Sequence, residues 1–485
     1  MLLVISNALI RGIGTVLLLL AVFLLGPIVI AILEGESINP FLLPLIGSGI
    51  AAMGILLLVP RPRKDITNRE GFALVTFSWV LACLIGAVPF VLSKVVPTIA
   101  DAIFESTSGF TTTGSSVFSD VEVLPKSILF WRAMTHWLGG MGIIVLAVAV
   151  LPMLGVSVYR LMQAEALGPS VERLTPRIVQ TARTFWVIYV AFTVLETILL
   201  IAGGLSVFDA LTHTFATLAT GGFSTRNASV GSFGSAYVEW VVTAFMILSG
   251  INFALYYRLL IRDFGRVFRD SELKAYGFLF TVSVIIVTFN LVQVGVFEKV
   301  GEAVRLGAFQ VATLMTSTGF TTTDYTLWPE LSQAILLMML FVGGCVGSTS
   351  GGIKMLHVVV LAKVIGSQVR RLINPREVFC TRINRRPLEG QTITAVTGFV
   401  FLYLVLVILS TLVVSSSGTD ILTSLTASLA VIGNIGPGFG RVGPAYNFGF
   451  LPSFVKVWLS IVMILGRLEI YTVLVLFWPR FATHR

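Results

Sequence analysis

The chain has 485 residues, of which 56% are hydrophobic and 12% charged, and its mean hydropathy is +0.93. This composition excludes an ordinary soluble globular protein. The net charge of +9 does not indicate nucleic-acid binding, because the basic residues cluster in alternate segments between apolar stretches. Such alternation is the positive-inside pattern of multi-pass membrane proteins, and it predicts that both termini are cytoplasmic.

Two apolar stretches open the chain, at residues 14–33 and 41–59, and each is long enough for a bilayer, which takes about 20 residues. The first is longer than the core of a signal peptide, and no clear small-residue cleavage site follows it. We therefore expect an N-terminal two-helix membrane hairpin with a basic cytoplasmic loop, at residues 1–69. The remaining basic clusters mark the later cytoplasmic segments, with these residues: Arg160, Arg173, Arg177, Arg183, Arg258, Arg262, Arg266, Arg269, Lys274, Lys363, Arg370, Arg371, Arg376, Arg382, Arg385, Arg386, Arg480 and Arg485.

Four copies of one unit are expected after this hairpin, at residues 70–172, 173–268, 269–386 and 387–485. Each copy contains a membrane helix, a half-length helix, a short glycine-containing tract and a second membrane helix. In the first copy, the two spans fall at residues 71–92 and 128–151, and the half-length helix starts at Ala100. The predicted fold class is an all-α multi-pass membrane protein, with about ten spans around a central pore. Because each copy enters and leaves on the cytoplasmic side, the copies are parallel repeats.

The tracts are the most informative feature of the repeat. Their final glycines lie 108, 97 and 117 residues apart. Glycine is also common where membrane helices pack closely, so a single tract would indicate little. Four tracts at similar spacing, each after a half-length helix, indicate a pore. They are Thr111-Thr112-Thr113-Gly114, Ala219-Thr220-Gly221-Gly222, Thr316-Ser317-Thr318-Gly319 and Gly433-Asn434-Ile435-Gly436.

The expected role of the tracts is to bind a cation through backbone carbonyl oxygens that replace its hydration shell. Irregular backbone survives at membrane depth only where it is buried or faces water. The tracts contain no carboxylate, which favours a monovalent ion over a divalent one. Acidic residues of the expected outer mouth could concentrate cations, or could be ordinary solvated loop residues. They are Asp120, Glu122, Asp324 and Glu330.

A gate is expected below the tracts of the third copy. A run of ten residues, 343–352, contains five glycines and three hydroxyl residues, which should not stay helical. Arg467 lies inside the last apolar stretch, where a buried arginine costs about 3 kcal/mol, so we expect it to face the pore. The predicted gate residues are Gly343, Gly344, Gly347, Gly351, Gly352, Lys354 and Arg467.

Two alternatives from other classes are weaker. A membrane enzyme would need clustered His, Asp, Glu or Cys at membrane depth, and the three cysteines have no metal-site spacing. A transporter that couples cation entry to H⁺ or Na⁺ would use ionisable groups at mid-membrane. Apart from Arg467 and Lys354, few such groups stand out. We therefore expect no enzymatic activity, and a channel is favoured over a coupled symporter.

Several motifs resemble the Trk/Ktr/HKT superfamily of potassium transporters, and most closely its bacterial TrkH type. They are residues 104–114, Gly433-Asn434-Ile435-Gly436-Pro437-Gly438, residues 343–354 and Gly466-Arg467-Leu468-Glu469. The helix pair before the first copy also resembles this type, and the match runs nearly end to end.

The resemblance implies potassium uptake across the bacterial cytoplasmic (inner) membrane, with the final glycines at the selectivity filter. Some relatives carry serine in the first tract and transport Na⁺, so Gly114 favours K⁺, although a Na⁺-permeable member stays an alternative. The resemblance also implies a homodimer and a cytoplasmic TrkA-like RCK ring that binds NAD or adenine nucleotides. The chain itself would bind K⁺ as its transported ion and no cofactor. The exact register of the second tract stays open between Gly221 and Gly222.

Overall fold

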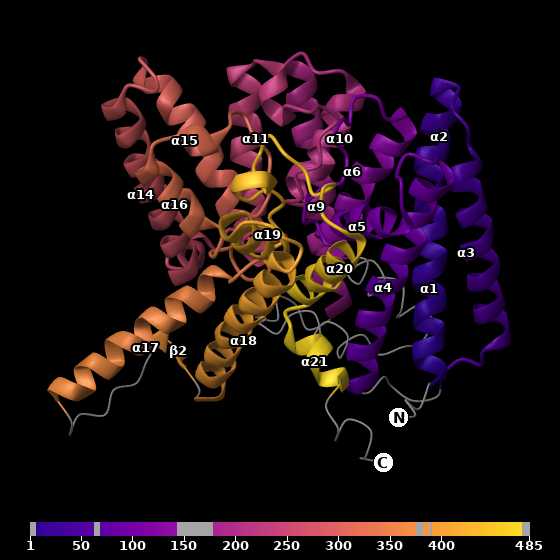
Figure 1. Ribbon diagram of the computed structural model, residues 1–485. Coiled ribbons are helices and arrows are strands. Elements are labelled where there is room, and N and C mark those ends of the chain that lie inside the picture. Colours follow the sequence, from indigo (N-terminus) through magenta and orange to yellow (C-terminus); the bar gives the residue numbers. More distant parts are fainter. Residues whose placement is uncertain are drawn as a thin grey trace.

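A computed structural model describes residues 6–62, 68–142, 178–374, 382–384, 386–388 and 390–477. Within these ranges the protein is helical except for a two-stranded antiparallel hairpin, β1 (Arg382–Ile383) and β2 (Arg386–Pro387). Figure 1 shows a bundle of long helices around shorter ones, from which one helix, α17, projects at the end that also holds the hairpin and α21. The end of the predicted first-copy span at Leu151 and several basic residues lie outside the described ranges, among them Arg160, Arg173, Arg376, Arg385 and Arg480.

The N-terminal hairpin lies at one edge of the bundle (Figure 1). It consists of α1 (Asn7–Phe23) and α2 (Leu25–Glu34), which together form one apolar span, and α3 (Asn39–Leu58). The helices α1 and α3 pack against each other and against α4. Arg11 lies near the start of α1 and donates a 2.8 Å hydrogen bond to the carbonyl of Leu56, so its charge is bound to the end of α3.

The four copies share one order of elements. Each begins with a long helix: α4 (Asn68–Leu92), α9 (Ile178–Ala202), α14 (Ser271–Val294) and α18 (Gly390–Ser415). A half-length helix follows: α5 (Ile99–Phe110), α10 (Val207–Leu218), α15 (Val300–Met315) and α19 (Ile421–Ile432). The second helices start at α6 (Lys126–Gly140), α11 (Ala236–Ser249), α16 (Glu330–Met339) and α20 (Ser453–Arg467), and single turns η2 (Ser229–Phe233), η3 (Tyr325–Leu327) and η4 (Gly440–Val442) precede three of them.

The half-length helices are short because polar caps and tract residues fix both ends. Ser206 and Asp420 cap α10 and α19, as Thr98 caps α5, by accepting from the backbone N–H three residues later. Each of these three helices has 12 residues and therefore spans about 18 Å, roughly half of the hydrocarbon thickness. They are buried over most of their length, so they form the inner layer of the bundle.

The second helices are interrupted. After α11 the chain bends by 94° into α12 (Phe253–Leu260), and after α20 it bends by 110° into α21 (Tyr471–Phe477). In the third copy, residues 340–354 form a loop between α16 and α17 (Met355–Ile373). We call this segment the glycine-rich loop. The sequence predicted an interruption only there; the breaks in the second and fourth copies are additional.

The number of spans follows from these breaks. Six described helices are long and apolar enough to cross a membrane, and the two bent pairs bring the number to eight. The other two of the ten predicted spans are not tested by this count: α6 borders residues 143–177, which lie outside the described ranges, and α16 and α17 are separated by the glycine-rich loop. A short helix α13 (Phe264–Val267) links the second copy to the third.

Ion pairs join one copy to the next. Lys456 on α20 pairs with Asp101 on α5 at 2.6 Å, and both side chains are at most 6% exposed. Arg305 on α15 pairs with Glu239 on α11 at 2.8 Å. In both cases the second helix of one copy is joined to the half-length helix of the following copy, and the first of these pairs connects the fourth copy back to the first.

Candidate functional site: a ring of four backbone tracts

The four tracts share one backbone conformation. The second residue of each tract has a left-handed φ between 51° and 55°, at Thr112, Thr220, Ser317 and Asn434. The last glycine of each tract has φ between 80° and 99°. Non-glycine residues seldom adopt positive φ, so four occurrences at one position of a repeat indicate a common constraint. This pattern places Gly222, and not Gly221, in register with Gly114, Gly319 and Gly436.

Hydrogen bonds to the preceding helix hold this conformation. The N–H of the third tract residue donates to a carbonyl five residues earlier in every copy, and each bond is 2.8 Å long. The C-terminal end of each half-length helix is therefore closed by its own tract, in the manner of a left-handed helix cap. The four pairs are Thr113 with Ser108, Gly221 with Ala216, Thr318 with Thr313, and Ile435 with Ala430.

The tracts form a closed ring. A Cβ added to Gly114 would clash with the carbonyl oxygen of Gly221, at less than 3.0 Å. The same clash relates Gly222 to the carbonyl of Thr318 and Gly319 to that of Ile435. Finally, a Cβ on Gly436 would clash with the carbonyl of Thr113. Each glycine thus lies against the backbone of the next tract, and the fourth tract lies against the first.

Side chains also cross between tracts. The Asn434 amide donates to Thr113 Oγ1 at 2.9 Å and to the carbonyl of Met463 at 3.1 Å, and Ser115 Oγ donates to the carbonyl of Gly436 at 3.0 Å. The first and third tracts each contain a bond between two threonine hydroxyls, of 2.8 and 2.7 Å. The ring is therefore built from carbonyl, hydroxyl and amide groups without a carboxylate, which is a donor set suited to a monovalent cation.

A polar residue nine positions before the tract glycine supports the segment that leaves the ring. In the first three copies this residue is Glu105, His213 and Gln310. Glu105 accepts from the N–H of Val117 at 2.9 Å, His213 Nε2 lies 2.9 Å from Ser224 Oγ, and Gln310 donates to Thr322 at 3.2 Å. Sequence reasoning did not select these residues, because the three differ in type and share only their distance to the glycine.

Glu105 belongs to a buried charge pair in the first copy. Its Oε1 accepts a 2.8 Å bond from Arg132 Nε, and the two side chains are 0% and 2% exposed. The Arg132 guanidinium also donates to Ser116 Oγ and to the carbonyl of Ser224, both at 3.2 Å. It therefore joins the segments that leave the first and second tracts, and its own charge is compensated where it is buried.

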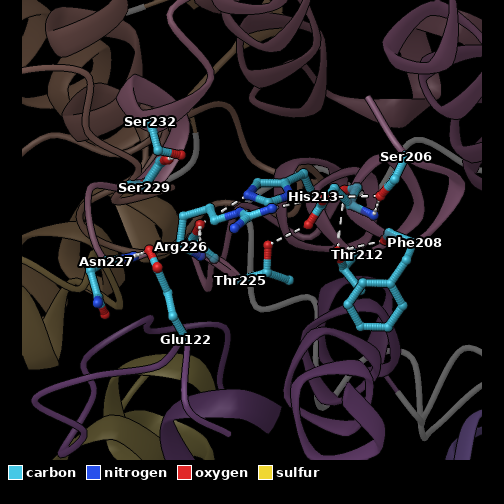
Figure 2. Close-up of polar contacts among 12 residues, drawn as sticks. Glu122, Ser206, Phe208, Thr212, His213, Thr225, Arg226, Asn227, Ser229 and Ser232 are labelled. Carbon is cyan, nitrogen blue, oxygen red and sulfur yellow. Dashed lines mark hydrogen bonds and ion pairs between the residues drawn. The ribbon is translucent and has the colours of Figure 1, made fainter. Parts of the chain in front are cut away.

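The second copy has a comparable support around Asp209, at the start of α10. Its carboxylate accepts from Thr225 Oγ1 at 2.7 Å and pairs with Arg226 at 3.4 Å. Figure 2 shows Thr225 and Arg226 lying beside His213, and the backbone N–H of Asn227 donates to Glu122 of the first copy at 3.1 Å. The His213 ring bonds α10 to the segment after the tract, because one ring nitrogen contacts the carbonyl of Asp209 and the other contacts Ser224.

Three of the four acidic residues predicted at the mouth, Asp120, Glu122 and Asp324, accept loop hydrogen bonds, and Glu330 lies in the first turn of α16. The Asn227 amide donates to Asp120 at 2.8 Å, and this hydrogen bond lowers the pKa of Asp120. The carboxylate of Asp324 accepts from Thr326. Asp120 and Glu122 remain exposed, so they both shape the loops and place acidic side chains at this face.

The glycine-rich loop lies against the third and fourth tracts. Its Gly351 N–H donates to Ser317 Oγ at 2.6 Å, and a Cβ on Gly351 would clash with the carbonyl of Gly433. Another bond, of 2.8 Å, runs from the Cys345 N–H to the carbonyl of Gly250, where α11 ends. The loop is thus attached both to the ring and to the break in the second copy. Lys354 is buried and donates to the carbonyl of Ser350.

Arg467 connects this loop to the first copy. Its guanidinium donates to the carbonyl of Thr349 at 2.7 Å, and to the carbonyls of Gly139 and Gly140 at 2.6 and 2.9 Å. These acceptors are the tip of the loop and the end of α6. Arg467, at the end of α20, therefore bonds both to the end of α6 and to the glycine-rich loop between α16 and α17.

The chain is similar in sequence and structure to known potassium uptake proteins. It is 38% identical over 472 residues to the Trk system potassium uptake protein TrkH of Escherichia coli (strain K12), covering 94% of this chain and 97% of that protein. The protein of the same name from Halomonas elongata is 36% identical over 477 residues, with 97% and 98% covered. The crystal structure of the potassium transporter TrkH from Vibrio parahaemolyticus superposes with a TM-score of 0.88, at 33% identity, over 98% of this chain and 99% of that chain. A family model described as "TrkH: Cation transport protein" matches residues 50–482.

The ring geometry predicts that Gly222→Ala destabilises the protein strongly. The methyl group would meet the carbonyl of Thr318 and would also require alanine at a φ of 80°. Strain and overpacking together should cost about 3 kcal/mol, read as a lower midpoint of thermal unfolding in detergent. The control is Gly47→Ala in α3, where nothing lies within 4 Å of the added Cβ and the helix should gain up to about 1 kcal/mol. Equal midpoints for the two variants would contradict the ring.

Proposed function

Because the chain belongs to the TrkH family of cation transport proteins, a family of transporters rather than enzymes, we propose that it takes up K⁺ across a bacterial cytoplasmic membrane. The observation that carries this proposal is the closed ring of four tracts with one backbone conformation. Carbonyl and hydroxyl oxygens of the ring replace the water of the ion. Potassium is the cargo of the site, and the chain needs no cofactor for this step.

Selectivity in this proposal depends on the size and rigidity of the ring. Each glycine gives the close approach that sets the distance between neighbouring tracts, and the supports at Glu105, His213 and Gln310 hold the outgoing segments. A side chain at Gly114 would displace the carbonyl of Gly221, which alters the spacing of oxygen atoms on the axis. Loss of that spacing favours the smaller Na⁺, or abolishes selection between the two ions.

The gate is proposed to be the glycine-rich loop together with Arg467. Backbone with five glycines in ten residues has low intrinsic rigidity, so its position depends on the hydrogen bonds that hold it. Arg467 supplies one of these bonds at Thr349 and places a positive charge below the ring. A fixed cation in a region of reduced dielectric raises the barrier for a passing cation. Opening then requires Arg467 and the loop to separate.

The proposed orientation places both termini in the cytoplasm. It is supported by the basic segments and by the arrangement in Figure 1, where α21 and the projecting end of α17 lie at the same end of the bundle. The last turn of α17 carries Arg370 and Arg371, both exposed. We propose this basic end as the face for a TrkA-like ring that binds NAD or adenine nucleotides, in an assembly built on a homodimer. Attraction to anionic lipid would act on the same residues.

A coupled symporter stays a second candidate because of one residue. Glu196 lies within the apolar span of α9, and its side chain is fully buried. Sequence reasoning, which found few ionisable groups at this depth, did not select it. A buried carboxyl within a membrane span is a candidate for proton transfer.

The first prediction concerns ion selection. In proteoliposomes that hold the purified chain, ⁸⁶Rb⁺ uptake should be blocked by K⁺ and little affected by Na⁺. The Gly114→Ser variant should lose about tenfold of this discrimination, because a difference of about 1.4 kcal/mol in ion binding is enough for that change. Equal competition by Na⁺ in the unmodified protein would contradict K⁺ selectivity and indicate a Na⁺-permeable member of the family.

The second prediction concerns the gate. Arg467→Ala should raise ⁸⁶Rb⁺ flux by about tenfold, because it removes both a fixed charge and a bond to the loop. Arg467→Lys retains the charge but cannot bind several carbonyls as a guanidinium does, so its flux should be intermediate. The matched control is Arg441→Ala at η4, on the outer side of the ring. Unchanged flux in Arg467→Ala would remove the gate hypothesis.

The third prediction separates a channel from a symporter. For a channel, Glu196→Gln should leave both the flux and its dependence on pH unchanged, since the glutamine is close in size to the neutral acid. For proton-coupled uptake, an imposed pH gradient should drive ⁸⁶Rb⁺ accumulation in the unmodified protein and fail to do so in the variant. The measurement is uptake at fixed membrane potential, with and without the gradient.

A further inference from the structure

Glu272 lies two residues after the cap of α14 and is directed toward the glycine-rich loop. Its Oε1 atom accepts from the N–H of Val346 at 2.8 Å and from the N–H of Leu356 at 2.9 Å. The side chain is 6% exposed. One carboxylate oxygen therefore holds two backbone positions that are ten residues apart, on either side of the loop segment that contacts Ser317 and Arg467.

The bond to Leu356 has a specific role at the start of α17. The first N–H groups of a helix have no partner within the helix and are usually bonded by a capping side chain. The cap position of α17 is Lys354, whose side chain makes no such bond. Glu272 supplies the missing acceptor from another helix, and its negative charge suits the positive end of the α17 dipole. The start of α17 and the glycine-rich loop are thus positioned by the same atom.

The hairpin of β1 and β2 contacts the same end of α14. Asn384, between the strands, donates to Asp270 Oδ2 at 2.8 Å and accepts from the N–H of Ser271 at 2.8 Å. Asp270 is the residue that caps α14, and it accepts from the N–H of Leu273 at 2.9 Å. Asn384 therefore fixes the helix turn that carries Glu272.

Apolar contacts join the hairpin to the loop as well. Ile383 and Leu388 pack in one cluster with Val346 of the loop and with Leu356 and Val360 of α17. Lys363 of α17 donates to the carbonyl of Arg382 at 2.6 Å. The hairpin therefore contacts α14, α17 and the loop at once, and a displacement of the hairpin acts on all three.

We infer that Glu272 is a positioning residue that couples the hairpin to the glycine-rich loop. When the hairpin is seated on Asp270 and Ser271, Glu272 holds Val346 and Leu356 and the loop stays closed under the ring. When a cytoplasmic partner displaces the hairpin, the turn at Asp270 shifts and Glu272 releases both N–H groups together. This inference rests on the proposed function of the loop as a gate, and its test separates the two.

The test uses the buried Cys345 thiol as a reporter of loop position. In a Cys83→Ser, Cys380→Ser background, the rate of Cys345 labelling by a membrane-permeant maleimide is measured beside ⁸⁶Rb⁺ flux in proteoliposomes. Glu272→Ala should speed labelling about tenfold, as expected for loss of one bond to a charged group. Glu272→Gln keeps an acceptor oxygen and should restore most of the protection. Asp263→Ala, whose carboxylate pairs with Arg266 in α13, is the matched control and should label as the parent does.

Asn384→Ala tests the connection to the hairpin. Asn384 is exposed, so this substitution should not affect folding. Its labelling rate should also rise, though less than in Glu272→Ala, because the loop bonds themselves remain. Parent-like labelling in either variant, or no rescue by glutamine, would overturn the coupling. Faster labelling without higher flux would keep Glu272 as a positioning residue and remove the gate function of the loop. Unchanged ⁸⁶Rb⁺ flux in the Arg467 variants would also remove the gate function of the loop, and it would leave the positioning role of Glu272 unaffected.

Discussion

At four places around one axis, the backbone of a tract comes closer to the carbonyl of the next tract than any side chain would allow. This contact is circular, so no tract can move outward without opening a gap on one side and pressing on its neighbour on the other. Each tract also closes the C-terminal end of its own half-length helix. The position of every carbonyl in the ring is therefore tied to the orientation of four helices. The remaining features of the protein can be understood as the means of holding these helices in place.

Ion pairs do much of this work from outside the ring. Glu105 with Arg132, Asp101 with Lys456, and Glu239 with Arg305 each connect elements of different copies or of neighbouring segments. A buried pair gains little in net stability over apolar packing, but its geometry is specific, and breaking it leaves a charge without compensation. Helices that are apolar on most faces could otherwise slide or rotate against each other. Because ion pairs are directional, they make one arrangement of the helices more stable than arrangements in which a helix is shifted or rotated.

The repeat, the half-length helices and the positions of the tracts could all be predicted from the sequence, because glycine spacing and apolar length are local properties. The register of the second tract could not, since Gly221 and Gly222 are equivalent until the φ of Thr220 is known. The breaks after Ser249 and at Arg467 could not be predicted either, because there the helical hydrogen bonds are replaced by contacts with the glycine-rich loop. The supports at His213 and Gln310 were missed because they share only their distance to the tract glycine, and their partners lie beyond the turn of the tract. Glu196 was missed because a single acid in an apolar run has no local pattern. Glu272 was missed because an acid among other charged residues at the start of a helix is ordinary in a sequence.

The pair of Lys456 and Asp101 joins residues that are 355 positions apart in the chain, and Arg467 reaches Gly139 across 328 positions. During synthesis the first tract is made long before either partner exists. Until the fourth copy has been inserted, Asp101 lacks the cation with which it pairs, and the first tract has a neighbour on one side only. Assembly therefore has high contact order and a late closing step, which exposes a partly formed molecule for most of translation. Quality control that recognises an unpaired acid at a helix interface would find its signal in Asp101, and insertion of the fourth copy would remove it.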